Sequence, residues 1–277
     1  MNQRERAETF HRSHTGPRVL LLPNIWDVVS ARVVEQAGFP ALATSSAAVA
    51  WTLGYPDGEQ ISREEMAATV ARIARHVSVP VTADMEAGYG RRPEDAAATA
   101  RAVIAAGAVG MNLEDAAKGE NELFDQALQV ERIRAAREAA TAAGVPIVIN
   151  ARTDVFLKQI GEPTSRVGHA VRRLNAYREA GAACLFAPGV KDAATIGVLA
   201  REIQGPLNIL GGPGAPSVPE LERLGVRRLS LGAGVMRAAL GAVRRVATEL
   251  GGAGTYAAMS DVALTDDINR LLTGTGR

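Results

Sequence analysis

The segment VTADMEAGYG, residues 81–90, places an apolar, β-rich run directly before two carboxylates and a glycine-flanked turn. Such a run predicts a short buried strand. Because alternate side chains of a strand share one face, we expect Asp84 and Glu86 to point the same way. Two neighbouring carboxylates are costly unless they share a cation or a proton, and oxygen ligands of this kind suit Mg²⁺. The segment therefore indicates a metal site, although an acidic strand end hydrogen-bonded into its own turn explains it equally well when it is taken alone.

Similar apolar runs recur along the chain at fairly even intervals, and Ala/Arg/Glu-rich stretches with helical spacing lie between them. One such stretch opens at Ser62 with a capping-box pattern. Strands that alternate with helices predict parallel βαβ units, and eight units suit a (β/α)₈ barrel, for which about 250 residues are typical. The expected strands are 18–22, 41–45, 81–86, 109–114, 147–152, 184–188, 207–210 and 228–232, and the clearest helices are 62–76, 93–106, 127–143 and 165–180.

A doubly wound open sheet is the alternative architecture. It is disfavoured because no glycine-rich phosphate fingerprint follows the first expected strand, where residues 22–27 read LPNIWD. Polar residues also follow many strands, as a barrel rim requires, rather than one switch point. We expect one domain over residues 1–277, with residues 251–277 as a helical extension that ends in a helix near 264–272.

Composition excludes several classes of protein. With 47% hydrophobic and 22% charged residues and a net charge of +1, the chain is typical of a soluble globular protein. Lys and Arg are spread along its length, which gives no footprint for nucleic acid. The longest mostly apolar stretch, 39–55, is too short and too polar to span a membrane, and residues 1–16 lack the apolar core of a signal peptide. The single cysteine, Cys184, is compatible with a reducing compartment. We expect a cytoplasmic protein that binds a small molecule and neither nucleic acid nor membrane.

Polar residues collect where the expected strands end, which is where functional groups lie in a (β/α)₈ barrel. Acids follow three consecutive strands and an arginine follows the next, a set that suits a divalent cation and a bidentate grip on a substrate carboxylate. Simpler roles exist for each: Asp57 as a turn residue, Glu114 and Asp115 as helix N-caps, and Arg152 as a partner of Asp154. The metal-ligand candidates are Asp57, Asp84, Glu86 and Glu114, and the substrate-binding candidates are Ser45, Ser46, Ala47, Asp84, Arg152 and Asn208.

Five motifs, in this order and spacing, resemble those of the isocitrate lyase/phosphoenolpyruvate mutase superfamily. The likeness extends from Leu22 to about Gly234. The motifs are PNIWD at 23–27, LGYPD at 53–57, ADMEAGYG at 83–90, NLED at 112–115 and ARTD at 151–154.

The resemblance implies a (β/α)₈ barrel that exchanges its last helix between subunits, in a homotetramer built as a dimer of dimers. It also implies Mg²⁺, with Mn²⁺ as a substitute, near Asp84, with the other three acids holding it directly or through water. Residues 45–47 match the segment that cradles the substrate carboxylate, and Arg152 matches the substrate-binding arginine.

Two departures from the family pattern matter. Glu86 stands where the family usually has aspartate, which makes metal coordination there more indirect. The family's lyases also carry a cysteine in the loop after the fourth strand, whereas residues 116–124 here read AAKGENELF. Cys184 lies within the sixth expected strand and is expected to be a core residue. We expect the loop to close over the site with Gly119 as its hinge, and Lys118, Glu120 and Asn121 to face the ligand.

The resemblance and the strand-end residues together favour a Mg²⁺-dependent carbon–carbon lyase. Its substrate would be a small 2-hydroxy or 2-oxo di- or tricarboxylate, similar to isocitrate or methylisocitrate, cleaved through an enolate to release a 2-oxo acid. The catalytic candidates are Arg152, Tyr89, Glu114 and Asn121. Oxaloacetate decarboxylase chemistry, which needs no thiol, is a close alternative. Phosphoenolpyruvate mutase or phosphonopyruvate hydrolase chemistry, toward which Asn121 points, and a non-catalytic barrel that binds a 2-oxo acid are the others. An aldol addition as in ketopantoate hydroxymethyltransferase is disfavoured by the long motif match.

Overall fold

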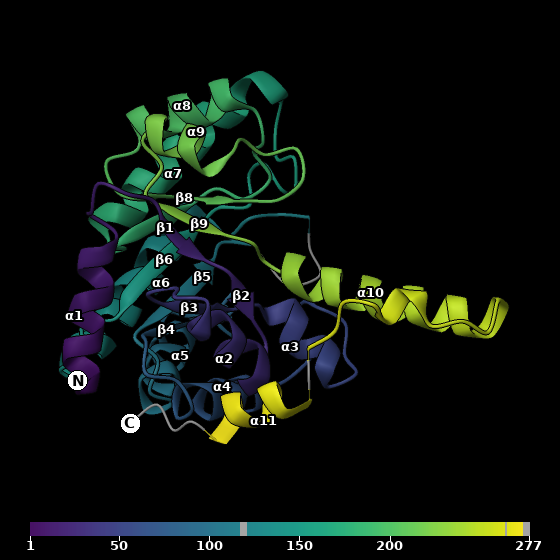
Figure 1. Ribbon diagram of the computed structural model, residues 1–277. Coiled ribbons are helices and arrows are strands. Elements are labelled where there is room, and N and C mark those ends of the chain that lie inside the picture. The colour runs from purple at the N-terminus through teal and green to yellow at the C-terminus, as the bar shows by residue number, and fades with distance from the viewer. Residues whose placement is uncertain (117–120, 264, 274–277) are drawn as a thin grey trace.

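The computed structural model describes residues 1–116, 121–263 and 265–273, and nine parallel strands in them form one barrel-shaped sheet (Figure 1). The predicted (β/α)₈ barrel is confirmed, and each of the eight expected strands is present, most of them trimmed by a residue or more. An open sheet is excluded because β1 pairs with β9 at one edge while β2, which follows β1 after one residue, pairs with β3 at the other. The strands are β1 Leu20–Leu22, β2 Asn24–Ile25, β3 Leu42–Thr44, β4 Val81–Asp84, β5 Gly110–Glu114, β6 Val148–Arg152, β7 Cys184–Phe186, β8 Leu207–Leu210 and β9 Arg228–Ser230.

The first strand of the barrel is divided into two short strands, β1 and β2, a feature that the sequence did not predict. β1 pairs with β9, β2 pairs with β3, and Pro23, which has no backbone N–H to give to a ladder, separates them. The side chain of Asn24 spans the join. Its Oδ1 accepts from the N–H of Leu231 at 2.7 Å, and its Nδ2 donates to the carbonyl of Thr44 at 2.7 Å. One side chain therefore links both ends of the sheet.

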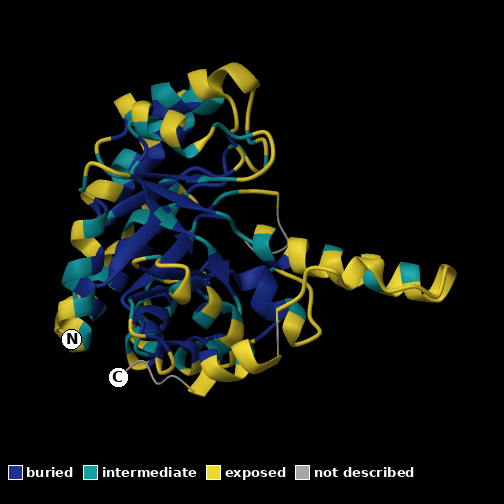
Figure 2. Ribbon diagram, in the orientation of Figure 1, coloured by how far each residue is buried: buried dark blue, intermediate teal, exposed yellow. Residues whose placement is uncertain are grey.

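Helices surround the strands, and local signals set where they begin. Ser62 and Glu65 form the predicted capping box before α4, and Pro93 opens α5. Figure 2 shows buried strands inside a shell of helices whose outer faces are exposed. The helices are α1 Gln3–Ser13, α2 Val28–Gln36, α3 Ser46–Thr52, α4 Arg63–Ala74, α5 Pro93–Ala105, α6 Gln126–Ala142, α7 Arg166–Glu179, α8 Ala193–Glu202, α9 Val218–Arg223, α10 Gly234–Gly252 and α11 Thr265–Thr273.

Helix α1 closes the N-terminal end of the barrel. Its Phe10 is completely buried and packs in one apolar cluster with Leu22, Val148 and Cys184. The contact is close, because a Cβ added at Gly110 would lie 2.9 Å from Cε1 of Phe10. Cys184 is thus a core residue, as predicted. With this end plugged by α1, the loops at the opposite end are left to form a site.

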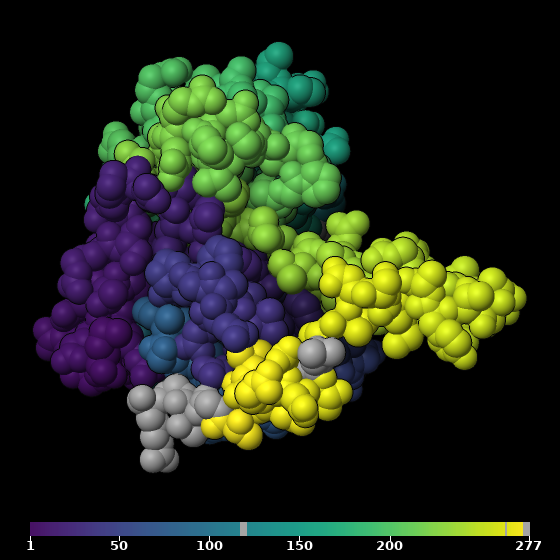
Figure 3. Space-filling view, viewed as in Figure 1, coloured from purple at the N-terminus to yellow at the C-terminus, as the bar shows by residue number. Residues whose placement is uncertain are grey.

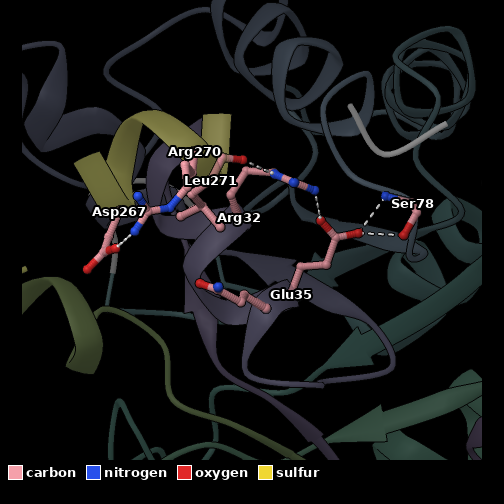
Figure 4. Close-up of a pocket in the computed structure, with 7 residues that line it drawn as sticks. Arg32, Glu35, Ser78, Asp267, Arg270 and Leu271 are labelled. Atoms are coloured by element: carbon pink, nitrogen blue, oxygen red, sulfur yellow. Dashed lines mark hydrogen bonds and ion pairs between the residues drawn. The ribbon is translucent and has the colours of Figure 1, made fainter. Parts of the chain in front are cut away.

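Helix α10 leaves the barrel as an arm, and the chain then returns along it (Figures 1 and 3). Of this helix only Met236 is buried. The predicted terminal helix is confirmed as α11, which packs on α2 of its own chain, where Leu271 is buried and its carbonyl accepts from Nε of Arg32 at 3.0 Å (Figure 4). Exchange of this helix between subunits stays a prediction. Within the described residues no helix is long and apolar enough to cross a membrane.

Candidate active site

The C-terminal ends of β3 to β6 surround an acidic hollow of about 190 Å³. A larger hollow, about 750 Å³, lies between α2, α11 and the segment before β4, and no residue from the C-terminal end of a strand lines it among the described residues (Figure 4). The smaller one carries the chemistry, since acidic and basic side chains from several βα loops meet there. Its charged lining consists of Asp57, Glu59, Glu86, Glu114, Asp154, Arg152 and Lys158, and Ser46 completes its polar groups.

The carboxylate of Asp84 is held in a fixed orientation by groups from two neighbouring elements, α3 and β5, and β6 supports the second of them. Its Oδ2 accepts from the backbone N–H and the hydroxyl of Ser46, at 3.1 and 3.0 Å. Its Oδ1 accepts from Nδ2 of Asn112 at 3.1 Å, and Oδ1 of Asn112 accepts from Asn150 at 2.7 Å. The two asparagines were not among the sequence candidates. Strand pairing is the signal that reveals them, because Asp84, Asn112 and Asn150 are direct partners across β4, β5 and β6.

Glu86 reaches the hollow through a turn rather than through the strand. β4 ends at Asp84, and Glu86 has a left-handed backbone with φ of 49°, so the expected strand alternation is wrong as the reason for their proximity. Its Oε2 accepts from the N–H of Glu59 at 2.5 Å, while its Oε1 is buried without a hydrogen-bond partner in the described structure. Burial, together with the charges of Asp57 and Asp84, raises the pKa of Glu86 to about 8.

Asp57 lies beside Asp84 and Glu86 and adds a third carboxylate to this acidic group. Its Oδ1 lies 3.4 Å from Oγ of Ser46, whose one hydroxyl proton it shares with Asp84. Burial and the neighbouring Asp84 raise the pKa of Asp57 above the ordinary value for an aspartate. Asp57 and Glu86, whose charged forms are disfavoured beside Asp84, indicate that a cation or a proton belongs among these carboxylates.

Arg152 joins two acids at the end of β6. Its Nε and Nη2 donate to the two carboxylate oxygens of Asp154, at 2.6 and 3.0 Å, and its Nη1 donates to Oε1 of Glu114 at 2.6 Å. Burial lowers the pKa of Arg152, but Glu114 and Asp154 outweigh this effect and raise it. At Glu114 the effect of burial is larger than the opposing effect of the Arg152 charge, so the pKa of Glu114 is raised. Arg152 therefore pairs with Asp154 and also lines the hollow. The sequence had left these two roles as alternatives.

The remaining candidates lie at different places in the structure. They are Ser45, Ala47, Asn208 and Tyr89. Ser45 is the N-cap of α3 and accepts from the N–H of Ala48, and Ala47 is buried in the first turn of that helix. Asn208 lies inside the barrel, where its Nδ2 donates to the hydroxyl of Ser230 at 3.3 Å, and it does not line the hollow. Tyr89 also lies outside the lining; its hydroxyl is buried without a described partner, and burial raises the pKa of this group.

Asp115, expected to be a helix N-cap, is instead a buried anchor. It is completely buried and accepts from Nε of Arg173 at 2.8 Å and from the hydroxyl of Tyr177 at 2.7 Å. The N-cap of α6 is Asp125. Arg173 also donates to the carbonyl of Phe124 at 2.6 Å, and the N–H of Phe124 donates to the carbonyl of Asp115 at 2.7 Å. This network fixes the point at which the expected loop rejoins the barrel.

The expected ligand-facing residues of that loop divide into two groups. Lys118, Gly119 and Glu120 lie outside the described residues. Asn121 is exposed and lines a separate hollow of about 480 Å³ beside α7, not the acidic one. The structure therefore does not bring Asn121 to the other candidates.

Arg132 is a functional support that the sequence did not reveal. It is completely buried in α6, where its guanidinium donates to the carbonyls of Gly90 at 3.0 Å, Glu114 at 3.4 Å and Ala87. These carbonyls belong to the turn after β4 and to the end of β5, so one side chain ties the two acid-bearing segments together. In the sequence Arg132 is one of three arginines in this helix, and nothing marks it as buried.

The acids of the hollow fit a divalent cation that keeps part of its water. Among the described residues, no three His, Cys, Asp or Glu side chains stand close enough to form a complete ligand set. Mg²⁺ is commonly bound through one or two carboxylates and several waters, so such a set is not needed. The unpartnered Oε1 of Glu86 and the raised pKa values of Asp57 and Glu86 show where positive charge is missing.

Comparison with known proteins identifies the family. The family model described as phosphoenolpyruvate phosphomutase matches residues 10–251. The chain belongs to the isocitrate lyase/phosphoenolpyruvate mutase superfamily. The superfamily resemblance drawn from the five sequence motifs is thereby confirmed.

Individual superfamily members agree with this placement and are themselves lyases, decarboxylases or mutases. The crystal structure of a candidate lyase/mutase from Burkholderia cenocepacia J2315 is 39% identical, with a TM-score of 0.92, and covers 98% of this chain and 96% of its own. An oxaloacetate decarboxylase from Rhodopseudomonas palustris is 29% identical over 83% of this chain and 79% of its own length. The crystal structure of a 2,3-dimethylmalate lyase is 28% identical, with a TM-score of 0.83, over 96% of this chain and 94% of its own.

Proposed function

We propose that this protein is a Mg²⁺-dependent enzyme that cleaves a carbon–carbon bond of a small 2-hydroxy or 2-oxo dicarboxylate and releases a 2-oxo acid. The observation that carries the proposal is the Arg152 guanidinium, held in plane by Asp154 and facing the same hollow as Asp57, Glu86 and Glu114. A fixed guanidinium beside clustered carboxylates is what a substrate carboxylate and a divalent cation need in one place. The hollow is small, which favours a dicarboxylate over a tricarboxylate.

Each residue group has a role in this proposal. Asp84, with Asp57, Glu86 and Glu114 directly or through water, would hold the cation, and a bound Mg²⁺ would supply Lewis-acid stabilisation of the negative charge that develops next to the cleaved bond. Ser46 orients Asp84 through two hydrogen bonds. Arg152 binds one substrate carboxylate, and Lys158, which also lines the hollow, adds positive charge for a second.

A proton donor is available without a thiol. Burial raises the pKa of Glu114, so in this proposal Glu114 faces the cation only through water and carries the proton that the product carbon or oxygen takes up. Cys184 cannot serve, because it is completely buried at the start of β7, at the barrel end plugged by α1.

Decarboxylation of oxaloacetate is the second candidate, and the position of Cys184 favours it. Decarboxylation needs a cation and a guanidinium but no thiol at the loop. The 29% identity to an oxaloacetate decarboxylase is consistent with this option, while the 28% identity to a 2,3-dimethylmalate lyase is equally consistent with the first. Both reactions cleave a carbon–carbon bond of a small dicarboxylate.

One assay separates the candidates. Purified protein is incubated with Mg²⁺ and, in turn, oxaloacetate, 2,3-dimethylmalate, methylisocitrate, isocitrate and phosphonopyruvate, and the 2-oxo acid products and CO₂ are followed with an EDTA-treated control. Metal-dependent release of a 2-oxo acid without CO₂ supports the first candidate, and release of CO₂ together with pyruvate from oxaloacetate selects decarboxylation. Turnover of phosphonopyruvate alone would assign the protein to C–P chemistry. Binding of 2-oxo acids without turnover of any compound would favour a binding protein.

A further inference from the structure

A further hollow, of about 270 Å³, lies at the N-terminal end of the barrel, opposite to the acidic hollow. Helix α1 covers this end (Figure 1). Its charged lining comes from three helices: His11 and His14 from the end of α1, Arg137 from α6 and Arg178 from α7. No Asp or Glu is among its described lining residues. The two ends of the barrel therefore differ in sign, with acids at one and bases at the other.

The two arginines at this hollow lack acidic partners. Nε of Arg137 donates to the carbonyl of Gly181 at 3.1 Å, and neither guanidinium forms an ion pair with a described carboxylate. Their stems lie close to the barrel end because glycines face them. A Cβ at Gly181 would be 3.0 Å from Cγ of Arg137, and one at Gly205 would be 3.2 Å from Cδ of Arg178. The glycines thus leave room for a cradle framed by two guanidinium groups.

A third arginine reinforces the positive charge from behind. Arg228 is 1% exposed, its Nε has no partner in the described structure, and no carboxylate pairs with it. Its Nη1 lies 3.5 Å from Nε2 of His14, whose Nδ1 donates to the carbonyl of Phe10 at 2.8 Å. His14 therefore accepts from Arg228 with a neutral ring. Burial lowers the pKa of Arg228, and the nearby Cys184 and Asp84 only partly offset this effect. A further negative group nearby would therefore be stabilising.

Helix ends do not cancel this charge. The C-terminal ends of α1, α6, α7 and α8 lie around the hollow, and each carries about half a negative elementary charge. Four such ends oppose about two positive charges, whereas Arg137, Arg178 and Arg228 supply one each. The balance at the hollow stays positive. In agreement, burial, followed by the charges of Arg137 and Arg178, lowers the pKa of His11.

We propose that this hollow is a binding site for a phosphate group, either inorganic phosphate or the head group of a small organic phosphate. A guanidinium presents paired N–H donors that match phosphate oxygens, and two of them from different helices can contact one tetrahedral anion from two sides. The site lies at the far end of the barrel from the proposed reaction and does not depend on the proposed function.

Isothermal titration calorimetry with inorganic phosphate and with glycerol 3-phosphate, at low salt and neutral pH, tests the proposal. We expect a Kd below about 1 mM for at least one of the two compounds. Replacing both arginines, Arg137→Ala with Arg178→Ala, should weaken binding by about tenfold or more per arginine, since each removes charge-assisted hydrogen bonds. The matched control is Arg134→Ala with Arg172→Ala, which removes the same charge from the exposed faces of the same two helices and should leave Kd within about twofold.

The acidic end of the barrel also contains an arginine, Arg152, so the place where phosphate binds has to be measured separately from its affinity. Phosphate binding must persist in Arg152→Ala, and amide NMR shifts on titration must be largest at Ala182 and Ala183, which line the hollow. Tighter binding of glycerol 3-phosphate than of phosphate would assign the site to an organic phosphate, and equal binding would assign it to the phosphate group alone. Absence of heat up to about 10 mM, equal Kd in the Arg137/Arg178 double variant, loss of binding in Arg152→Ala, or preference for malonate over both phosphates would overturn the proposal.

Discussion

Arg152 and Asp154 face each other through two parallel hydrogen bonds, 2.6 Å from Nε to Oδ1 and 3.0 Å from Nη2 to Oδ2. Asp154 is itself fixed, because its backbone N–H donates to Oδ1 of Asp115 at 3.0 Å and its side chain is 3% exposed. The pair sets the plane of the guanidinium and leaves Nη1 directed to Glu114. An incoming carboxylate therefore meets an arginine whose orientation is already determined.

Replacing Arg152 with lysine should raise KM for the dicarboxylate by about tenfold or more, because an ammonium cannot form two parallel bonds and still present a donor to the substrate. Steady-state kinetics measure the effect. The same change at exposed Arg134, on the outer face of α6, should leave KM unchanged. An Arg152→Lys enzyme with wild-type KM would show that this arginine only supports the strand end.

Asp84→Asn should weaken metal activation by about tenfold to a hundredfold, because the change removes the charge at the centre of the acid cluster while keeping its size. The dependence of activity on Mg²⁺ concentration, together with Mn²⁺ binding followed by EPR, reports the loss. Asp192→Asn at the N-cap of α8, far from the hollow, is the control for a general effect of removing one carboxylate. Unchanged Mn²⁺ affinity in Asp84→Asn would remove Asp84 from the metal site.

Arg132→Met should lower the free energy of unfolding by about 3 kcal/mol or more. The carbonyls of Ala87, Gly90 and Glu114 would lose a buried donor, and each orphaned group costs about 1–3 kcal/mol. Urea denaturation measures the change. Arg134→Met, two residues along the same helix but exposed, should alter stability by less than about 0.5 kcal/mol. Similar stabilities of the two variants would contradict the anchoring role.

Gly88→Ala should be more destabilising than Gly54→Ala, although both positions have left-handed backbones, with φ of 91° and 84°. Each substitution carries a backbone cost of about 1–2 kcal/mol. At Gly88 the new Cβ would also lie 2.8 Å from Cδ1 of Leu113 and 3.2 Å from Nη2 of Arg132, whereas at Gly54 no atom of the described residues lies within 4 Å of it. Thermal unfolding of both variants tests the difference, and equal midpoints would show that the turn adjusts without strain.

Acid should destabilise the protein through His14. Burial and Arg228 lower the pKa of His14 from 6.5 to about 3 in the folded state, so between these values only the unfolded chain takes up the proton. This contribution to stability is complete above pH 6.5 and is lost as the pH falls toward 3, by about 2 kcal/mol between pH 7 and pH 5. Urea denaturation at the two pH values measures it. A His14→Gln variant, which has no titrating group at this position, should lose less stability over the same interval.

Much of the fold could be predicted from local pattern. Apolar runs that end at Asp84, Glu114 and Arg152 are strands because their β-branched and aliphatic residues are buried on both faces, and parallel strands of this kind depend on little beyond their own composition. Helix starts at Ser62 and Pro93 follow from side-chain capping and a fixed φ, which act within one turn.

Interactions between distant segments were beyond such patterns. Asp115 has the composition of an N-cap, yet it pairs with Arg173, 58 residues along the chain. Glu86 lies in the hollow because of a left-handed turn, and a sequence alone does not distinguish this from a continued strand. Asn121 matches a loop residue in type but lies at another hollow.

The sequence by itself determined the barrel, the superfamily and the acids and arginine that meet at one end, since strand order in a parallel βα chain places every strand end on the same rim. Tertiary structure decided which of these groups touch. It set the Arg152–Asp154 plane, the Asp84–Asn112–Asn150 line across three strands, and the uncompensated arginines beneath α1. Such relations depend on register and burial, and these are properties of the packed chain rather than of any segment.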